Sequence, residues 1–301
     1  MLGRFNTWRS AAIWRYVPFA ALSDGQQYLM ERYALTLYTP AGGQGISATN
    51  TSQWQIAGLG VTQAVTMRDD SDRAFSALPA VRAELDGIVR SAASPAGLVP
   101  GSIALDPQFT RLRFEQSLPR FSVLHVASHF QFTPGSEYLS YLVLGDGTRL
   151  SLADLKEMDF NGVQLLTLSA CDTATGGGRN ERGSEVEGLG AAVQLAGAKA
   201  VLASLWQVSD TSTAQLMRRF YELRTRDNTL TTAQALRQAQ LDMLRGTSVD
   251  NEPAVADTTK RAALPVLGPG EAEAKPFAAD AAHPFAHPYF WAPFILMGNW
   301  L

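Results

Sequence analysis

The amino-acid sequence predicts an α/β fold in which a mostly parallel β-sheet is covered by helices on both sides. Two observations lead to this prediction. Short apolar runs at 121–127, 163–168 and 200–206 have the length of buried strands and are too short for typical helices. Segments with helical periodicity separate such runs, as after residue 209. Strands that alternate with helices form parallel sheets with both faces covered.

The composition fits one large domain. With 301 residues and 46% hydrophobic side chains, the chain can bury a sizeable core, and no linker divides it before residue 247. We therefore predict a single domain over 1–301. Residues 247–285, rich in alanine, proline and acidic side chains without periodicity, are predicted to be a flexible insertion before the last strand.

Charge and cysteine usage limit the partners and the compartment. A net charge of −3 and a pI near 5.8 give no electrostatic reason to expect nucleic acid or an anionic membrane. The single cysteine, Cys171, excludes an internal disulfide and suits a reducing compartment. No apolar run is long enough to span a membrane, and the start of the chain is a poor signal peptide. We expect a cytoplasmic protein without a membrane partner.

The first part of the chain is predicted to contain short strands and two helices. Helix 78–92 follows from its apolar face of Leu78, Val81, Leu85 and Val89, with Pro79 near the first turn. The expected elements are short strands with turns over 15–66, including a reversal at Ser23–Gly25 and a strand within Trp54–Val65, the helix Leu78–Ala92, a loop over 93–101, and a weaker helix Phe109–Leu118 stopped by Pro119.

The second part continues the alternation of strands and helices. The glycines of Gly145-Asp146-Gly147 indicate a hairpin turn, and Ser184 starts the spacing of a capping box. The expected elements are a strand ending at Ala127, a hairpin of 141–144 and 148–150, a helix from Ser151 to Met158, strand 163–168, a helix from Ser184 to near Gly197, strand 200–206, a helix capped by Ser209 or Asp210, helix Thr232–Leu244 ended by Gly246, and an edge strand Phe290–Met297 containing Pro293.

Two strands end in side chains that suit nucleophilic catalysis. Cys171 follows the apolar run 163–168 and precedes a glycine-rich stretch, and His129 follows the run 121–127. If the two strands are parallel neighbours, both side chains face the rim where α/β sheets bind ligands. An imidazole with a pKa near about 6.5 raises the thiolate fraction of a thiol whose pKa is about 8.5. The sequence therefore predicts a Cys171–His129 pair.

The same residues also have simpler, non-catalytic interpretations. An isolated cysteine most often packs in a core, and a loop histidine often bonds a backbone carbonyl. His125 is expected to point into the packing of the sheet. Asp210 is either a helix N-cap or part of a substrate pocket, and Asp172 either orients His129 or stabilises its own loop.

No metal ion or other cofactor is expected. His283 and His287 have the spacing of metal ligands, but a proline follows each, so no helix presents them together. The glycines 176–178 lack the lysine and hydroxyl residue that end a phosphate-binding loop, so a nucleotide site has little support.

Several stretches together resemble the CHAT family. These are WRYVPFAAL, FSVLHVASHF, LTLSACDTATGGG, SEVEGLGAAVQLAGAKAVLASLWQVSD and HPYFWAPFILMGNW, in an order that covers the chain from about Trp14 to Trp300. The family comprises caspase-like cysteine peptidase domains, related to caspases, separases and gingipains (clan CD), that often lie next to tetratricopeptide repeats in bacteria. The resemblance implies a caspase-like three-layer sandwich.

The resemblance also implies roles for individual residues. Cys171 matches the nucleophile of the family and His129 its general base, so the implied activity is endopeptidase cleavage of a protein or peptide substrate. The backbone N–H groups of Phe130 and Cys171 would form the oxyanion hole. Phe130 stands where the family commonly has glycine, and its bulky side chain is expected to narrow the mouth of the site.

Substrate choice and regulation follow from the same resemblance. Trp206, Asp210 and Asp172 are assigned to substrate binding, and the carboxylate of Asp210 would favour a basic P1 residue. A tetratricopeptide-repeat region or another partner would regulate the activity. The alternative is a catalytically silent caspase-like interaction module, which the phenylalanine at position 130 favours.

Overall fold

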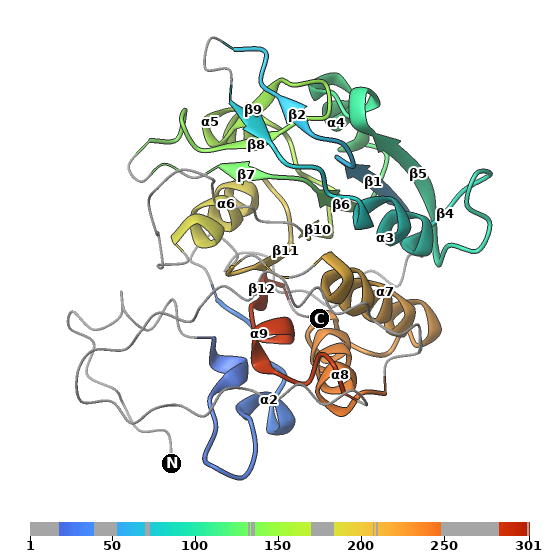
Figure 1. The fold of residues 1–301 in the computed structure, drawn as a ribbon, viewed down its shortest axis with the longest axis vertical. Coiled ribbons are helices and arrows are strands. Elements are labelled where there is room, and N and C mark those ends of the chain that lie inside the picture. Colours follow the sequence, from blue (N-terminus) through green and yellow to red (C-terminus); the bar gives the residue numbers. More distant parts are fainter. Residues whose placement is uncertain are drawn as a thin grey trace.

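A computed structural model describes residues 18–38, 53–69, 73–131, 133, 136–169, 184–206, 208, 210–247, 283–299 and 301; of 184–187 and 210 only the backbone is described. Within this part, the main sheet has seven strands in the order β12-β11-β10-β6-β1-β5-β4 (Figure 1). All its pairs are parallel except β11 with β12, which is antiparallel. The strands of this sheet are β1 (Ile56–Gly60), β4 (Val89–Arg90), β5 (Val99–Leu105), β6 (Val123–Ala127), β10 (Leu165–Leu168), β11 (Ala200–Ser204) and β12 (Phe294–Gly298).

Two smaller sheets and a set of helices complete the described part. The hairpin β2-β3 consists of Val65–Thr66 and Ala74–Phe75, and a three-stranded sheet has the order β7-β8-β9 (Phe130–Gln131, Tyr141–Val143, Arg149–Ser151). The helices are α2 (Leu29–Arg32), α3 (Ala80–Ile88), α4 (Arg111–Ser117), α5 (Leu152–Glu157), α6 (Ser184–Leu195), α7 (Asp210–Arg226), α8 (Thr232–Arg245) and α9 (Pro288–Trp291), with 3-10 turns η1 (Phe19–Ala21) and η3 (Asp106–Gln108).

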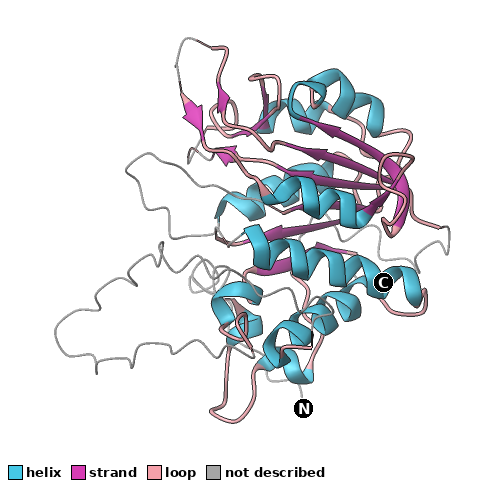
Figure 2. Cartoon of the chain, turned by 45° about the vertical axis from the view of Figure 1, so that its right-hand side comes forward, coloured by secondary structure: helices cyan, strands magenta, loops and turns pink. Residues whose placement is uncertain are grey.

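Helices cover both faces of the main sheet, which Figure 2 shows as a layer between them. On one face α4, α5 and α6 bury Phe114, Leu155 and Leu189 in one core cluster. On the other face α7 and α8 pack around Phe220 and Leu236 in a second cluster, with α3 alongside α7. The predicted three-layer α/β sandwich with a mostly parallel sheet is confirmed.

β6 and β10, the strands that precede His129 and Cys171, are parallel neighbours. Their register pairs Val123 with Leu165 and His125 with Thr167. Both strands are buried along their whole length, as expected for apolar runs in a covered parallel sheet. The predicted adjacency of these two strands is confirmed.

Most other predicted elements are also confirmed with small shifts of their ends. The hairpin β8-β9 is antiparallel, and Ser151 caps α5 by accepting a bond from the Asp154 N–H. Helix α8 ends at Gly246, whose φ of 66° is the left-handed conformation that glycine adopts most readily. β12 lies at the edge of the sheet, as Pro293 suggested.

The loop predicted over 93–101 was partly wrong, because β5 begins at Val99; its first two residues pair with β4, and Gly101–Leu105 pair with β1. Pro100 and Gly101 are residues typical of loops, so the sequence did not predict this strand. Gly101 lies opposite Ile56, and a Cβ there would come within 1.9 Å of the Ile56 carbonyl oxygen. Glycine therefore marks a close approach of two strands here, and the proline lies in the short pairing with β4.

Three further boundaries differ from the prediction. Helix α3 ends at Ile88, because Val89 turns extended and pairs with β5 instead of continuing the helix. In 18–38 the reversal at Gly25 is present, but helical turns replace the predicted strands, and Glu31 stabilises α2 by accepting from the Tyr28 N–H. The last strand begins at Phe294, since Pro288 starts the short helix α9.

Candidate active site

His129 lies directly after β6 and is fully buried. Its Nε2 is 2.8 Å from the Ser76 carbonyl oxygen. A carbonyl oxygen can only accept a hydrogen bond, so Nε2 carries the proton. In a neutral imidazole the other nitrogen, Nδ1, then has the lone pair and is the basic atom.

The hairpin β2-β3 holds the ring of His129 from one side. Phe75, the last residue of β3, packs its ring 5.2 Å from the imidazole, and Ser76 follows directly. Arg73, just before β3, donates to the Gln131 side chain in β7 at 2.8 Å. The hairpin is therefore attached to the strand that follows His129 as well as to the histidine itself.

Phe130 begins β7, and its ring is buried in the core cluster of the α4–α6 face. The expectation that this side chain narrows the mouth of the site is wrong, because the ring packs among core residues. The Val143 N–H donates to the His129 carbonyl at 2.9 Å, so these two residues form a hydrogen-bonded pair of the β7-β8 ladder. Pairs alternate in an antiparallel ladder, so the Phe130 N–H is directed away from β8.

The other predicted site residues are placed only in part. Cys171 and Asp172 lie outside the described residues, and Asp210 is the first residue of α7 with its side chain undescribed. Trp206 follows β11 and donates from Nε1 to the Tyr289 carbonyl at 3.1 Å. Its ring stacks on that of Tyr289, which is 40% exposed, at a centroid distance of 6.3 Å.

His125 lies within β6 and belongs to a buried polar network. Its Nε2 is 2.9 Å from Glu84 Oε1 of α3, and its Nδ1 is 3.2 Å from the Tyr221 hydroxyl of α7. That hydroxyl is 2.8 Å from Thr167 Oγ1 of β10. Burial raises the pKa of Tyr221, so it remains a neutral phenol. The prediction that His125 points into the packing of the sheet is confirmed.

Sequence reasoning missed the groups that contact the histidines, and Ser76 and Glu84 show two different reasons for this. Ser76 acts through its backbone carbonyl, for which the identity of a side chain gives no signal. Glu84 had a signal, since it lies on the buried face of α3 between Val81 and Leu85 and is itself buried. A carboxylate on the apolar face of a helix needs a polar partner, and here the partner is His125.

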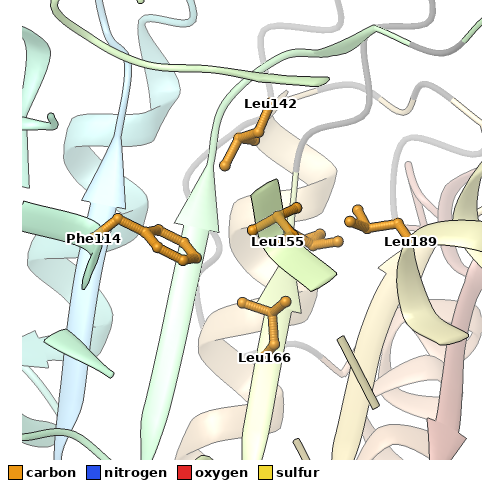
Figure 3. Close-up of a pocket in the computed structure, with 6 residues that line it drawn as sticks. Phe114, Leu142, Leu155, Leu166 and Leu189 are labelled. Carbon is orange, nitrogen blue, oxygen red and sulfur yellow. The ribbon is translucent and has the colours of Figure 1, made fainter. Parts of the chain in front are cut away.

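Beside these polar contacts, the described residues also line an apolar cavity. A small cavity next to β10 is lined only by apolar side chains (Figure 3), namely Phe114, Leu142, Leu155, Leu166, Leu168 and Leu189. Within the described ranges, no group of three or more His, Cys, Asp or Glu side chains is arranged to hold a metal ion. None of the helices in that part of the chain is both long and apolar enough to span a membrane.

The sheet order, the two helical layers and a buried histidine just after β6 define a three-layer α/β protein with a mostly parallel central sheet. The chain belongs to the CHAT domain family, whose model matches residues 7–299.

Solved structures similar to this chain include the complex of Porphyromonas gingivalis RgpB pro- and mature domains. It has a TM-score of 0.43 and 11% identity, and the match covers 82% of this chain and 47% of that one. The Arg-specific cysteine proteinase gingipain R matches with a TM-score of 0.42 and 11% identity over 82% of this chain and 46% of its own. The chain thus spans about half the length of these structures. No curated protein matched in the sequence comparison.

Proposed function

We propose that this CHAT domain is a cysteine endopeptidase in which Cys171 is the nucleophile and His129 the general base. The observation that carries the proposal is the 2.8 Å contact between His129 Nε2 and the Ser76 carbonyl. This contact fixes the tautomer and leaves Nδ1 as the nitrogen that can take a proton from a thiol. A histidine held in this way at the end of a parallel strand suits base catalysis.

The register of β6 and β10 supports the pairing with Cys171. His125 is paired with Thr167. Counting four residues onward in the sequence gives 129 from His125 and 171 from Thr167, both beyond the ends of the strands, so the two residue types needed for the dyad stand at equal sequence offsets from one paired position. Parallel strands deliver such positions to the same edge of a sheet.

The proposed reaction is acyl transfer to the cysteine followed by hydrolysis. Nδ1 of His129 takes the thiol proton, the sulfur attacks the carbonyl carbon of the scissile peptide, and the backbone N–H groups of Phe130 and Cys171 stabilise the oxyanion. The protonated His129 then gives its proton to the leaving amine. Water, deprotonated by the same imidazole, hydrolyses the thioester and restores the thiol.

We further propose that the substrate is a protein or peptide cleaved after a basic P1 residue. Asp210 starts α7 just beyond β11, at the same edge of the sheet as His129, and a carboxylate there would pair with arginine or lysine. Trp206 and Asp172 complete the proposed substrate-binding group. Asp210→Asn is expected to lower kcat/KM for an Arg peptide by at least about tenfold while leaving a neutral P1 peptide unaffected, which steady-state kinetics measures.

The test of the activity itself compares wild type with Cys171→Ala. The wild-type thiol is expected to react with iodoacetamide well below pH about 7, because a paired thiolate persists there, and to cleave Arg or Lys fluorogenic peptides. Assays include a tetratricopeptide-repeat partner, since we propose that such a region regulates the site. Slow labelling with an ordinary thiol profile, together with equal inertness of both proteins in every state, would establish the silent interaction module instead.

A further inference from the structure

Two buried histidines, His125 within β6 and His129 just after it, are attached to one neighbouring segment. His129 Nε2 bonds the Ser76 carbonyl at 2.8 Å, and His125 Nε2 bonds the Glu84 carboxylate at 2.9 Å. Ser76 leads into α3, and Glu84 lies within that helix. The segment 76–84 is therefore attached at two points, to His129 at the edge of the sheet and to His125 inside the sandwich.

The Glu84–His125 contact requires the desolvation of a carboxylate, a free-energy cost that a purely structural contact could avoid. Glu84 and His125 are both almost completely buried, and two apolar side chains of similar size would fill the same volume without the cost of desolvating a carboxylate. What the Glu84–His125 hydrogen bond adds is a defined position for α3. A carboxylate oxygen of Glu84 accepts a hydrogen bond from the Nε2–H of His125 along one direction, and this bond fixes where α3 sits along β6.

The network also reaches the second strand of the site. With His125 neutral, the Tyr221 hydroxyl donates to His125 Nδ1 and accepts from the Thr167 hydroxyl. His125 and Thr167 are directly paired positions of β6 and β10. The Tyr221 hydroxyl of α7 therefore bonds to directly paired positions of β6 and β10, the two strands that precede His129 and Cys171.

We propose that Glu84 and His125 are positioning residues: by fixing α3 on β6 they place the Ser76 carbonyl so that it selects the Nε2–H tautomer of His129. The link to catalysis rests on the proposed function, whereas the selection of the tautomer does not. Tyr221 and Thr167 connect β10 to the same hydrogen-bond network. Neither Glu84 nor His125 contacts the substrate in this scheme.

The first test is the tautomer of His129, read from ring nitrogen-15 NMR shifts. The chain has only four histidines, so single substitutions assign each ring. Wild type is expected to show the Nε2–H form alone. Glu84→Met, which removes the acceptor, is expected to give a mixture of both forms, whereas Glu84→Gln keeps a carbonyl oxygen for His125 and retains the single form. A single unchanged form in Glu84→Met overturns the proposal.

The second test is kinetic and uses the same variants. Glu84→Met is expected to lower kcat and the rate of Cys171 alkylation at least about tenfold with KM nearly unchanged, because the substrate contacts persist while the base is misplaced. Glu84→Gln is expected to restore both rates. Met243→Ala in α8 is the control: it loses buried packing far along the chain from the network and should leave both rates as in wild type.

The outcomes separate the two proposals. Slow alkylation of the wild type, together with inertness equal to that of Cys171→Ala in every state, defeats the peptidase function, while the NMR result still decides the positioning role. Rapid alkylation of wild type and Glu84→Met alike defeats the positioning role and leaves the peptidase standing. Should Glu84→Met not fold, the double variant Glu84→Met, His125→Phe replaces both partners by apolar side chains of similar size and removes the same contact, and an unchanged tautomer and rate in that variant overturn the proposal equally.

Discussion

His125 within β6 and His129 just after it show how the partner of a side chain sets its role. His129 bonds a backbone carbonyl, which has no charge to gain or lose, so its ring is oriented without being paired with an anion. His125 bonds a buried carboxylate on one side and a phenol on the other. The first arrangement suits a base that must change its protonation state, and the second suits a fixed structural contact.

Tyr221→Phe is expected to lower the free energy of unfolding by about 1–3 kcal/mol at neutral pH. The ring keeps its packing beside Trp54 and Phe220, but His125 and Thr167 each lose a buried hydrogen-bond partner. Urea unfolding of both proteins measures the difference. A loss below about 0.5 kcal/mol would mean that water replaces the phenol in the network.

The same variant predicts a pH dependence of stability. Burial raises the pKa of Tyr221 in the folded state above its unfolded value of 10.0. The phenol is neutral in both states below that value, so its contribution is then complete. Above it only the unfolded state ionises and the contribution is lost. The stability difference between wild type and Tyr221→Phe should therefore shrink by about 0.8 kcal/mol near pH about 10.5, since the other tyrosines titrate in both proteins.

The site could be predicted from the sequence only where side-chain identity carries the signal. His129 at the end of an apolar run and the adjacency of β6 and β10 follow from pattern and strand alternation. The Ser76 carbonyl does not, because any residue supplies the same group and only the fold brings it to the ring. Glu84 was visible as a charge on an apolar face, but its partner lies on another element and needs the tertiary structure.

At the level of elements, the hidden strand β5 explains why local signals fail. Proline and glycine usually mark loops, yet Pro100 and Gly101 lie in β5. Local propensity gave the wrong answer because the pairing with β1 decides the conformation, and that pairing joins residues far apart in the chain. Helix α8 was simpler to predict, since Thr231 and Gly246 cap it at both ends within the local sequence.

Gly101→Ala is expected to destabilise the protein by about 1–3 kcal/mol. The added methyl group would lie 1.9 Å from the Ile56 carbonyl oxygen and 2.8 Å from the Ile56 side chain, so β1 and β5 must separate. Gly188→Ala in α6 is the matched control, because nothing lies within 4 Å of a Cβ there and alanine favours a helix by about 1 kcal/mol. Thermal unfolding should move in opposite directions; equal shifts would contradict the close approach.

At the scale of the whole molecule, a segment from the start of the described chain covers the sheet edge formed by its end. Leu37 donates to the Leu296 carbonyl at 2.7 Å and forms a parallel bridge with Met297, next to the edge strand β12. Figure 1 shows α2 beside α8 and α9 at this end of the molecule. An exposed strand edge invites pairing with other chains, and this segment covers part of it.

Arg237 of α8 attaches that segment to the helical layer. Its guanidinium donates to the Met30 carbonyl at 2.6 Å and to the Glu31 carbonyl, the backbone of α2. Hydrogen bonds from a charged donor contribute about 1.5–3 kcal/mol. Arg237→Met keeps most of the aliphatic length but loses both bonds, so we expect α2 and the bridge at Leu37 to open locally while β6 and β10 stay closed.

Hydrogen exchange measured by mass spectrometry tests this expectation. Peptides covering 28–38 should exchange at least about tenfold faster in Arg237→Met, and peptides of the central strands should be unchanged, because local opening leaves the core intact. Arg245→Met on the same helix is the control: its guanidinium lies 4.0 Å from the Glu31 carboxylate and is 55% exposed, so its loss should have little effect. Uniformly faster exchange across β6, β10 and α8 would instead show that the segment and the core unfold as one unit.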